Sequence, residues 1–190
     1  MPSPKQARSA GRQGATRAAA KIEIRRLTEK DAREFYRLRL EALEREPQAF
    51  GESPEEHRAM TLDMIAKRLG STSDDSNFVS GAFVADRLVG MAGFYQQHGA
   101  KSRHKGHVWG VYVTEEWRGK GVARKVLAEL VQMARSIPQL EQLHLGVAAG
   151  QNAAKRVYES LGFEAYGCEP RAIKLANSYV DEDLMVLRLR

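Results

Sequence analysis

The sequence contains little cysteine and no long hydrophobic run, and each absence removes a class of protein. Cys168 is the single cysteine of 190 residues, so the chain forms no internal disulfide and fits a reducing compartment. We interpret this cysteine as a small packing residue rather than a nucleophile. No run of about 18 apolar residues occurs, so we predict no transmembrane helix and no membrane partner. We therefore expect a cytoplasmic protein.

Acidic residues are absent from the first 21 positions. The chain has 30 Lys and Arg against 24 Asp and Glu, a net charge of +6, and residues 1–21 hold five of these cations. The remainder is nearly neutral, so no strongly basic domain and no nucleic-acid partner are expected. We predict a disordered basic tail over 1–21 and one domain over 22–190. Weak nucleic-acid contact, an organelle transit peptide or a misassigned start are the alternatives for the tail.

The apolar periodicity predicts a mixed α/β sheet in one domain. Strands are expected over residues 22–27, 78–85, 88–95, 108–113, 140–147, 163–168 and 184–189. Helices are expected between Thr28 and Pro47 and over residues 55–69, 122–135 and 152–161. Thr28 is the expected N-cap of the first helix, with Asp31 completing a near capping box. A tight Asp86–Arg87 turn is expected to join the second and third strands.

The stretch 107–135 holds a strand, a loop with two glycines and a helix. The strand ends in the β-branched and aromatic residues Val111, Tyr112 and Val113. The loop and helix start read Arg118, Gly119, Lys120, Gly121, Val122, Ala123, Arg124. Free N–H groups and the positive dipole end of such a helix bind a diphosphate. The alternative is an ordinary strand-to-helix turn, because the loop is neither a P-loop nor a dinucleotide fingerprint.

A second motif lies one strand downstream, where Asn152 caps a helix that carries Tyr158 and ends at Gly162. In the first motif, Arg118 and Gly121 occupy two fixed places of the Arg/Gln-x-x-Gly-x-Gly/Ala loop of the GCN5-related N-acetyltransferases, and Ala123 occupies the third. In that family the loop cradles the pyrophosphate of acetyl-coenzyme A. The two motifs together identify residues 22–190 as similar to this family, and to an uncharacterised bacterial subgroup of it.

The resemblance implies a fold and an activity. The fold is a mixed, mostly antiparallel sheet of about seven strands, flanked by four helices, with strands 4 and 5 splayed apart. The activity is transfer of an acetyl group from acetyl-coenzyme A to a primary amine by direct attack in a ternary complex. The acceptor would be a small molecule or a protein N-terminus or lysine, and no metal is expected. The alternative is a coenzyme A-binding sensor or scaffold without turnover. The oligomeric state is left open, with a homodimer as the candidate assembly.

The resemblance also implies cofactor contacts. The backbone of Val111, Tyr112 and Val113 would contact the thioester and the pantetheine arm. Arg118 and the backbone of Gly119 to Arg124 would hold the pyrophosphate, and Asn152 would touch the pantetheine. The extra residue before Asn152, compared with relatives, predicts a bulge at this point.

Two catalytic roles follow from the resemblance. Tyr158 would protonate the departing thiolate, since a phenol has a pKa near 10 against about 8.5 for a thiol; the alternative is a core tyrosine. The proton acceptor is less determined, because the family's carboxylate on strand five is replaced by Gly146 and Val147. His107, at the start of strand four, is the candidate base, and a water chain to backbone carbonyls is the alternative.

Acceptor recognition is expected between the first two helices and the last strands. Phe50, Tyr95, Glu169 and Tyr179 are the candidate lining residues. Asp181 and Glu182 are further acidic groups that would attract a cationic amine. The alternative for these charges is a solvated hairpin edge that discourages aggregation.

Overall fold

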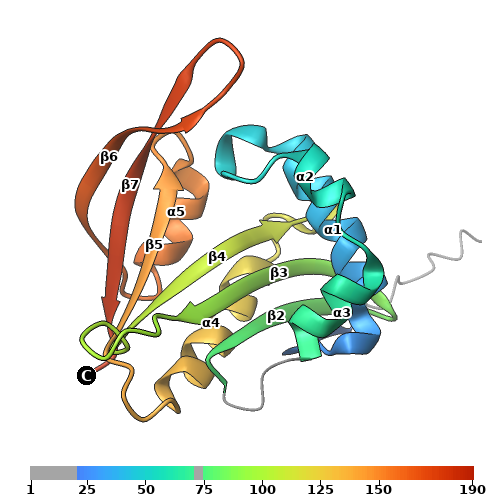
Figure 1. The fold of residues 1–190 in the computed structure, drawn as a ribbon, viewed down its shortest axis with the longest axis horizontal. Helices are drawn as coiled ribbons and strands as arrows, with labels where there is room; N and C mark the ends of the chain where they lie inside the picture. Colours follow the sequence, from blue (N-terminus) through green and yellow to red (C-terminus); the bar gives the residue numbers. More distant parts are fainter. Residues whose placement is uncertain (1–20, 71–74) are drawn as a thin grey trace, which may run out of the picture.

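The computed structural model describes residues 21–70 and 75–190, so the predicted tail, except for its last residue, lies outside the described part. A seven-stranded sheet forms the centre of the molecule, in the order β1-β2-β3-β4-β5-β7-β6 (Figure 1). Its strands are β1 (Ile22–Arg26), β2 (Asn77–Val84), β3 (Arg87–Gln96), β4 (Lys105–Val113), β5 (Gln142–Ala148), β6 (Glu164–Lys174) and β7 (Tyr179–Arg188). Only β4 and β5 pair in parallel, and all other neighbours are antiparallel. The predicted sheet is confirmed.

Five α-helices cover the sheet, where the sequence predicted four. They are α1 (Ala32–Arg45), α2 (Pro54–Arg58), α3 (Leu62–Gly70), α4 (Val122–Arg135) and α5 (Asn152–Glu159). The expected helix over 55–69 is wrong, because it is divided at Ala59 to Thr61. The Thr61 hydroxyl accepts a hydrogen bond from the Met64 N–H at 3.2 Å, which starts a new helix. At the first helix, the predicted capping box of Thr28 and Asp31 is confirmed.

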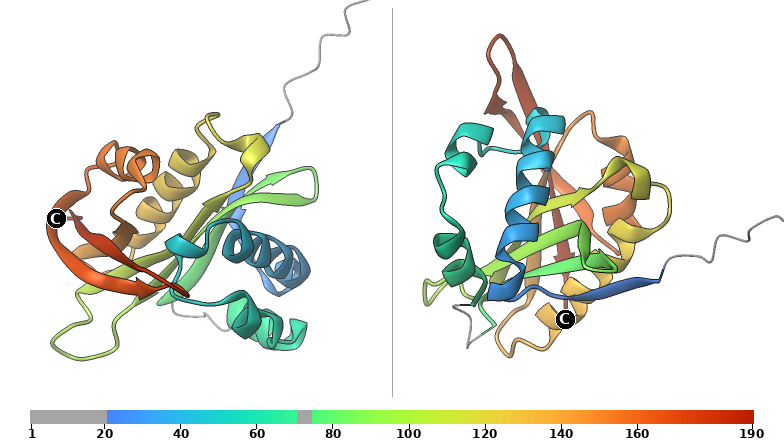
Figure 2. Two further views of the ribbon diagram at one scale, coloured as in Figure 1. Left: turned by 90° about the horizontal axis from the view of Figure 1, so that it is seen from above. Right: turned by 90° about the vertical axis from the view of Figure 1, so that its right-hand side faces the viewer.

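The helices form a layer on each face of the sheet (Figure 2). Helices α1 and α3 pack on one face around Phe35, Leu38 and Ile65, a group that we call the α1–α3 core. Helices α4 and α5 pack on the other face around Leu127, Leu130 and Tyr158, which we call the α4–α5 core. Helix α4 buries the apolar stripe that the sequence predicted, since Val122, Val126, Leu127, Leu130, Val131 and Ala134 are all buried.

A bulge and a divergence of strands open the sheet at its centre. Gly110 has φ of +64°, and β4 gains one residue against β3 at this point. Strand β4 pairs with β5 only from Lys105 to His107, opposite Gln142 to His144. Beyond this the two strands separate, and Figure 1 shows them fanning apart. The predicted splaying of strands 4 and 5 is confirmed.

Several boundaries differ from the sequence prediction. The hairpin turn is Ala85–Asp86 rather than Asp86–Arg87, because Val84 pairs with Arg87 and Ala85 adopts φ of +52°. The last two strands extend to Lys174 and back from Tyr179, well beyond the predicted limits. Their outer halves carry no apolar alternation, so periodicity alone did not reveal them. Cys168 lies in the exposed part of β6 and is not a packing residue.

Candidate active site

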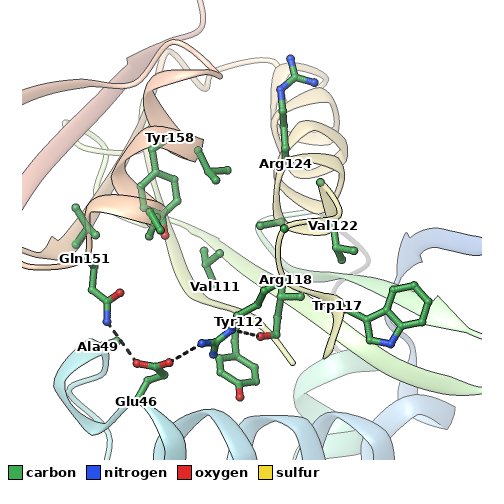
Figure 3. A pocket seen from close by; sticks show the side chains of 18 of the residues that line it. Glu46, Ala49, Val111, Tyr112, Trp117, Arg118, Val122, Arg124, Gln151 and Tyr158 are labelled. Atoms are coloured by element: carbon green, nitrogen blue, oxygen red, sulfur yellow. Dashed lines mark hydrogen bonds and ion pairs between the residues drawn. The ribbon is translucent and has the colours of Figure 1, made fainter. Parts of the chain in front are cut away.

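A cavity of about 370 Å³ lies where β4 and β5 separate (Figure 3). This volume is in the range of small-molecule binding sites. Val122 and Tyr158 in its wall belong to the α4–α5 core, whereas Tyr112 belongs to the α1–α3 core. The cavity therefore reaches into the opening between the strands and is bounded by residues from both layers.

Most of the predicted cofactor-binding residues line this cavity. They are Val111, Tyr112, Val113, Arg118, Gly119, Gly121, Val122, Ala123 and Arg124. Two of the predicted residues do not line it. Lys120 places its ammonium 4.6 Å from the centre of the Trp117 ring, and Asn152 is exposed. The predicted residues that line the cavity thus come from the end of β4, the glycine loop and the start of α4.

The glycine loop has the backbone that a phosphate cradle needs. Gly119 and Gly121 have φ of +71° and +73°, in the left-handed region that favours glycine. A Cβ added at either residue would meet no atom within 4 Å, so the space beside this backbone is open. Gly121 is also the N-cap of the 14-residue helix α4, and the first N–H groups of a helix have no partner within it. The residues present fit the diphosphate of a coenzyme A molecule.

Glu46, which the sequence analysis did not single out, connects the two sides of the cavity (Figure 3). One carboxylate oxygen lies 2.9 Å from Nη1 of Arg118, and the other accepts a hydrogen bond from Nε2 of Gln151 at 3.4 Å. Arg118 also donates from Nε to the carbonyl of Val113 at 3.0 Å. No local pattern marks Glu46, because Arg118 and Gln151, its partners across the cavity, lie on distant segments of the chain.

The second motif is shifted by one residue from the prediction. Gln151 is the N-cap of α5 and lines the cavity, whereas Asn152 is the first helical residue, is exposed and does not line the cavity. The predicted bulge is instead a tight turn, in which the Gln151 N–H donates to the Ala148 carbonyl at 2.8 Å. The extra residue is absorbed in this turn, which brings Gln151 to the cavity.

Tyr158 has a ring that packs in the core and a hydroxyl that faces the cavity, so it has features of both a core tyrosine and a proton donor. Its ring is 6% exposed and packs edge-on against Phe163 in the α4–α5 core. Its hydroxyl points into the cavity (Figure 3). Burial raises the pKa of the Tyr158 phenol above its ordinary value, so the group is protonated at neutral pH. It can therefore donate a proton into the cavity.

Tyr112 differs from Tyr158 in the use of its hydroxyl. The hydroxyl donates to Oε1 of Glu41 at 3.2 Å, and the Arg118 guanidinium lies 5.4 Å from the ring centre. Burial, with the Glu41 charge, raises the pKa of Tyr112 to about 12. The Tyr112 hydroxyl is thus held on the α1 side, and it is Tyr158 whose hydroxyl faces the cavity.

His107 lies on the paired part of β4 and does not line the cavity. Its Nε2 is 2.8 Å from Nε2 of Gln97, and its ring stacks on Tyr95 and meets His144 at centroid distances of 5.0 and 5.6 Å. Burial, reinforced by Lys105, lowers the pKa of His107, so the ring is neutral near pH 7. Its protonation state suits a base, but its place is away from the cavity.

The predicted acceptor residues are dispersed. Phe50 lines the cavity, and the Arg39 guanidinium lies 4.7 Å from its ring centre. Tyr95 stands beside His107, and Tyr179 stacks under Arg171 at 3.8 Å. Glu169 is exposed on β6, opposite Glu182 of β7. Of these residues, only Phe50 is in the cavity wall.

Arg39 is a buried charge that the sequence did not mark. It is 5% exposed and donates from Nε and Nη2 to Glu52 at 3.0 and 2.8 Å. Its Nη1 is buried without a hydrogen-bond partner among the described residues. Because Glu52 follows Phe50 closely in the chain, this pair fixes the segment that carries the Phe50 wall.

Two features are absent from the part of the chain that the structure describes, residues 21–70 and 75–190. Within these ranges, no group of three or more His, Cys, Asp or Glu side chains is placed to hold a metal ion. No helix in the same ranges is long and apolar enough to cross a membrane.

Comparison with known proteins shows a match to one protein family and similarity to bacterial proteins. Residues 33–163 match the sequence profile described as the acetyltransferase (GNAT) family. A 96-residue segment, 50% of this chain, is 35% identical to an uncharacterized protein of Mycobacterium leprae and covers 25% of it. A 73-residue segment, 38% of this chain, is 28% identical to the L-amino acid N-acetyltransferase AaaT of Escherichia coli and covers 45% of it. The chain thus spans less than half the length of these two relatives.

A solved structure is similar over nearly the whole domain. It is yncA from Salmonella typhimurium, determined with its cofactor acetyl-coenzyme A. The two chains are 20% identical, with a TM-score of 0.77 over 89% of this chain and 94% of the other. At this identity the likeness establishes the fold.

Proposed function

The chain belongs to the acetyltransferase (GNAT) family, and we propose that it transfers an acetyl group from acetyl-coenzyme A to a primary amine. The observation that carries the proposal is the continuity of one cavity, from the open glycine backbone of Gly119 and Gly121 to the Tyr158 hydroxyl. The positive charge of Arg118 and Arg124 beside the glycine loop suits a diphosphate. The Tyr158 hydroxyl can supply a proton to a leaving thiolate.

Binding of the coenzyme is assigned to the loop and to the start of α4. The N–H groups that follow Gly121 would donate to the diphosphate, and Arg118 and Arg124 would supply positive charge beside it. The pantetheine arm would run between Val111 of β4 and Val147 of β5, which both line the cavity beyond the paired part of these strands. An N–H of the opened β4 strand would donate to the thioester carbonyl, where negative charge develops.

The chemistry supplied by the coenzyme is an activated acetyl thioester. Tyr158 would give its proton to the sulfur as the carbon–sulfur bond breaks, because its phenol is protonated at neutral pH and its hydroxyl faces the cavity. The apolar side chains of Val147 and Val157 would keep water away from the same point. The acceptor amine would approach through the opening between β4 and β5.

The test is calorimetric titration of the purified protein with acetyl-coenzyme A, followed by thiol release on a panel of amines. The panel would contain free amino acids, because one relative is named for such acceptors, together with polyamines and peptides with free N-termini. We expect binding and release on one class of amine. Tight binding with no release on any amine would favour a sensor, and no binding would overturn the proposal.

A further inference from the structure

Strand β5 has no carboxylate of its own at Gly146 or Val147, but the carboxylate of Glu182, on the neighbouring strand β7, lies over it. Gly146 is the fifth residue of β5, and a Cβ built on it would lie 2.5 Å from Oε2 of Glu182. Glu182 belongs to β7 and pairs in register with Ala148 of β5. Its side chain therefore leans along the sheet into the space that a side chain at position 146 would fill.

The carboxylate lies on the sheet face opposite to Tyr158. Leu145 and Val147 point into the α4–α5 core, so Gly146 between them faces the other side. Along β7, Met185 and Leu187 also join the α4–α5 core, which turns Glu182 away from it. Tyr158 lies within the α4–α5 core. The Glu182 carboxylate thus lies over β5, the strand that borders the opening, on the sheet face opposite to Tyr158.

Glu182 differs from the acidic residues on either side of it in β7, which both have partners. Asp183 pairs with Lys155 of α5 at 2.8 Å, and Asp181 accepts the backbone N–H of Arg171 at 2.6 Å. Among the described residues, Glu182 makes no side-chain hydrogen bond and no ion pair, although it is half-buried. A half-buried carboxylate without a cation is only partly solvated, so an approaching ammonium group would stabilise its charge.

We propose that Glu182 receives the ammonium group of the acceptor at the β4–β5 opening and acts as the base that removes its proton. This inference rests on the proposed function and names the class of ligand for that face, a primary alkylammonium ion. It also replaces His107 as the candidate base, because the His107 ring is already engaged by Gln97, Tyr95 and His144 on the paired part of β4.

The proton balance of the step is complete. The acceptor nitrogen loses two protons in turn to Glu182, which passes each of them to water, as the nitrogen–carbon bond forms and the carbon–sulfur bond breaks. Tyr158 donates one proton to the sulfur and regains one from water. The net products are the acetylated amine, a free thiol and one proton in solution.

The electrostatic surroundings make Glu182 a stronger base than an ordinary carboxylate. Burial, with the charge of Glu169 on the neighbouring strand, raises the pKa of Glu182 above its ordinary value. The titratable groups beside it on its own strand, Asp181 and Asp183, both have partners. A carboxyl with a raised pKa is a stronger base for an ammonium proton.

The first experiment compares Glu182→Gln with the wild-type protein on the best amine found. We expect kcat/KM at pH 7 to fall at least about 100-fold, with unchanged affinity for acetyl-coenzyme A. Glu182→Asp should recover part of the loss, and Gly146→Ala should cost about tenfold because the new Cβ displaces the carboxylate. The control is Glu164→Gln, an exposed residue of β6 that pairs with Arg188.

The pH profile separates a base from a residue that only maintains structure. Wild-type kcat/KM should rise with pH as Glu182 loses its proton, and Glu182→Gln should abolish that limb. Glu169→Gln should move the limb to lower pH, because it removes the like charge that raises the pKa of Glu182. Carbon-13 NMR of labelled glutamate in the unliganded protein should show one carboxyl titrating above the ordinary range and missing from Glu182→Gln.

The outcomes are distinct. Retention of more than a third of kcat/KM with an unchanged pH limb in Glu182→Gln would overturn the role of Glu182 and leave the acetyltransferase proposal standing. The absence of thiol release on every primary amine by the wild-type protein would overturn both.

Discussion

Glu46 Oε1 lies 2.9 Å from Arg118 Nη1, so a carboxylate that follows α1 neutralises a cation at the cavity mouth. The Glu46 side chain is 23% exposed and that of Arg118 is 45% exposed, so solvent and salt screen the pair only in part. An anionic coenzyme must therefore enter past a negative charge that already occupies one of its cationic partners.

The first prediction concerns this pair. Glu46→Gln should tighten coenzyme A binding about two- to fivefold at low ionic strength, because it frees Arg118 and removes a repulsive charge. The gain should shrink in high salt. Calorimetry at two salt concentrations measures it, with Glu44→Gln as the control, since Glu44 pairs with Arg58. Weaker binding in Glu46→Gln would mean that the pair serves chiefly to position Arg118.

The glycine cradle gives a second prediction. Gly121→Ala should lose about 1 kcal/mol of stability, because its φ of +73° is strained for an L side chain, and its new Cβ would enter the open space of the cradle. We expect coenzyme affinity to fall at least tenfold. Gly162→Ala is the control, because Gly162 has φ of +91° at the end of α5 and does not line the cavity. Equal losses of affinity in both variants would contradict the cradle.

Tyr158→Phe tests the proton donor. Removal of the hydroxyl keeps the ring packing against Phe163, so stability and coenzyme affinity should change little. Turnover should fall about 100-fold, because no other phenol points into the cavity from α5. Steady-state kinetics and calorimetry measure the two effects, and Tyr166→Phe, at an exposed residue of β6, is the control. Undiminished turnover would remove Tyr158 from the mechanism.

Acid stability should depend on Asp31. Its carboxylate accepts hydrogen bonds from Arg25 at 2.7 and 2.8 Å and from the Thr28 N–H at 2.8 Å. The bonds from Arg25 hold the pKa of Asp31 below its usual range in the folded protein. The stabilisation is therefore present above the unfolded pKa of about 4 and is lost as the pH falls through the lower folded pKa.

The corresponding variant is Asp31→Asn. It should destabilise the protein by about 2 kcal/mol at pH 7 and flatten the loss of stability below pH 4. Urea unfolding at several pH values measures both effects. Glu23→Gln is the control, since Glu23 contacts Arg25 at 3.7 Å with a 64% exposed side chain. A parallel acid profile in Asp31→Asn and the wild-type protein would contradict this account.

Local patterns account for the parts of the fold that the sequence predicted. The alternation of apolar residues located all seven strands, and the helical period from Val122 located α4 with its buried face. Local chemistry also marked the glycine loop, because left-handed backbone at Gly119 and Gly121 leaves a signature in residue type. The errors fall where a single polar residue decides a boundary, as at Thr61, which starts α3.

The amino-acid sequence by itself determined the family, the order of the strands and helices, and the loop that begins α4, because each depends on residues close together in the chain. Only the tertiary structure decided which polar groups meet at the cavity. Glu46 reaches Arg118 and Gln151, and Glu182 fills the space left by Gly146, through contacts between segments distant in sequence. Such contacts depend on the twist, bulge and separation of β4 and β5, which no local pattern encodes.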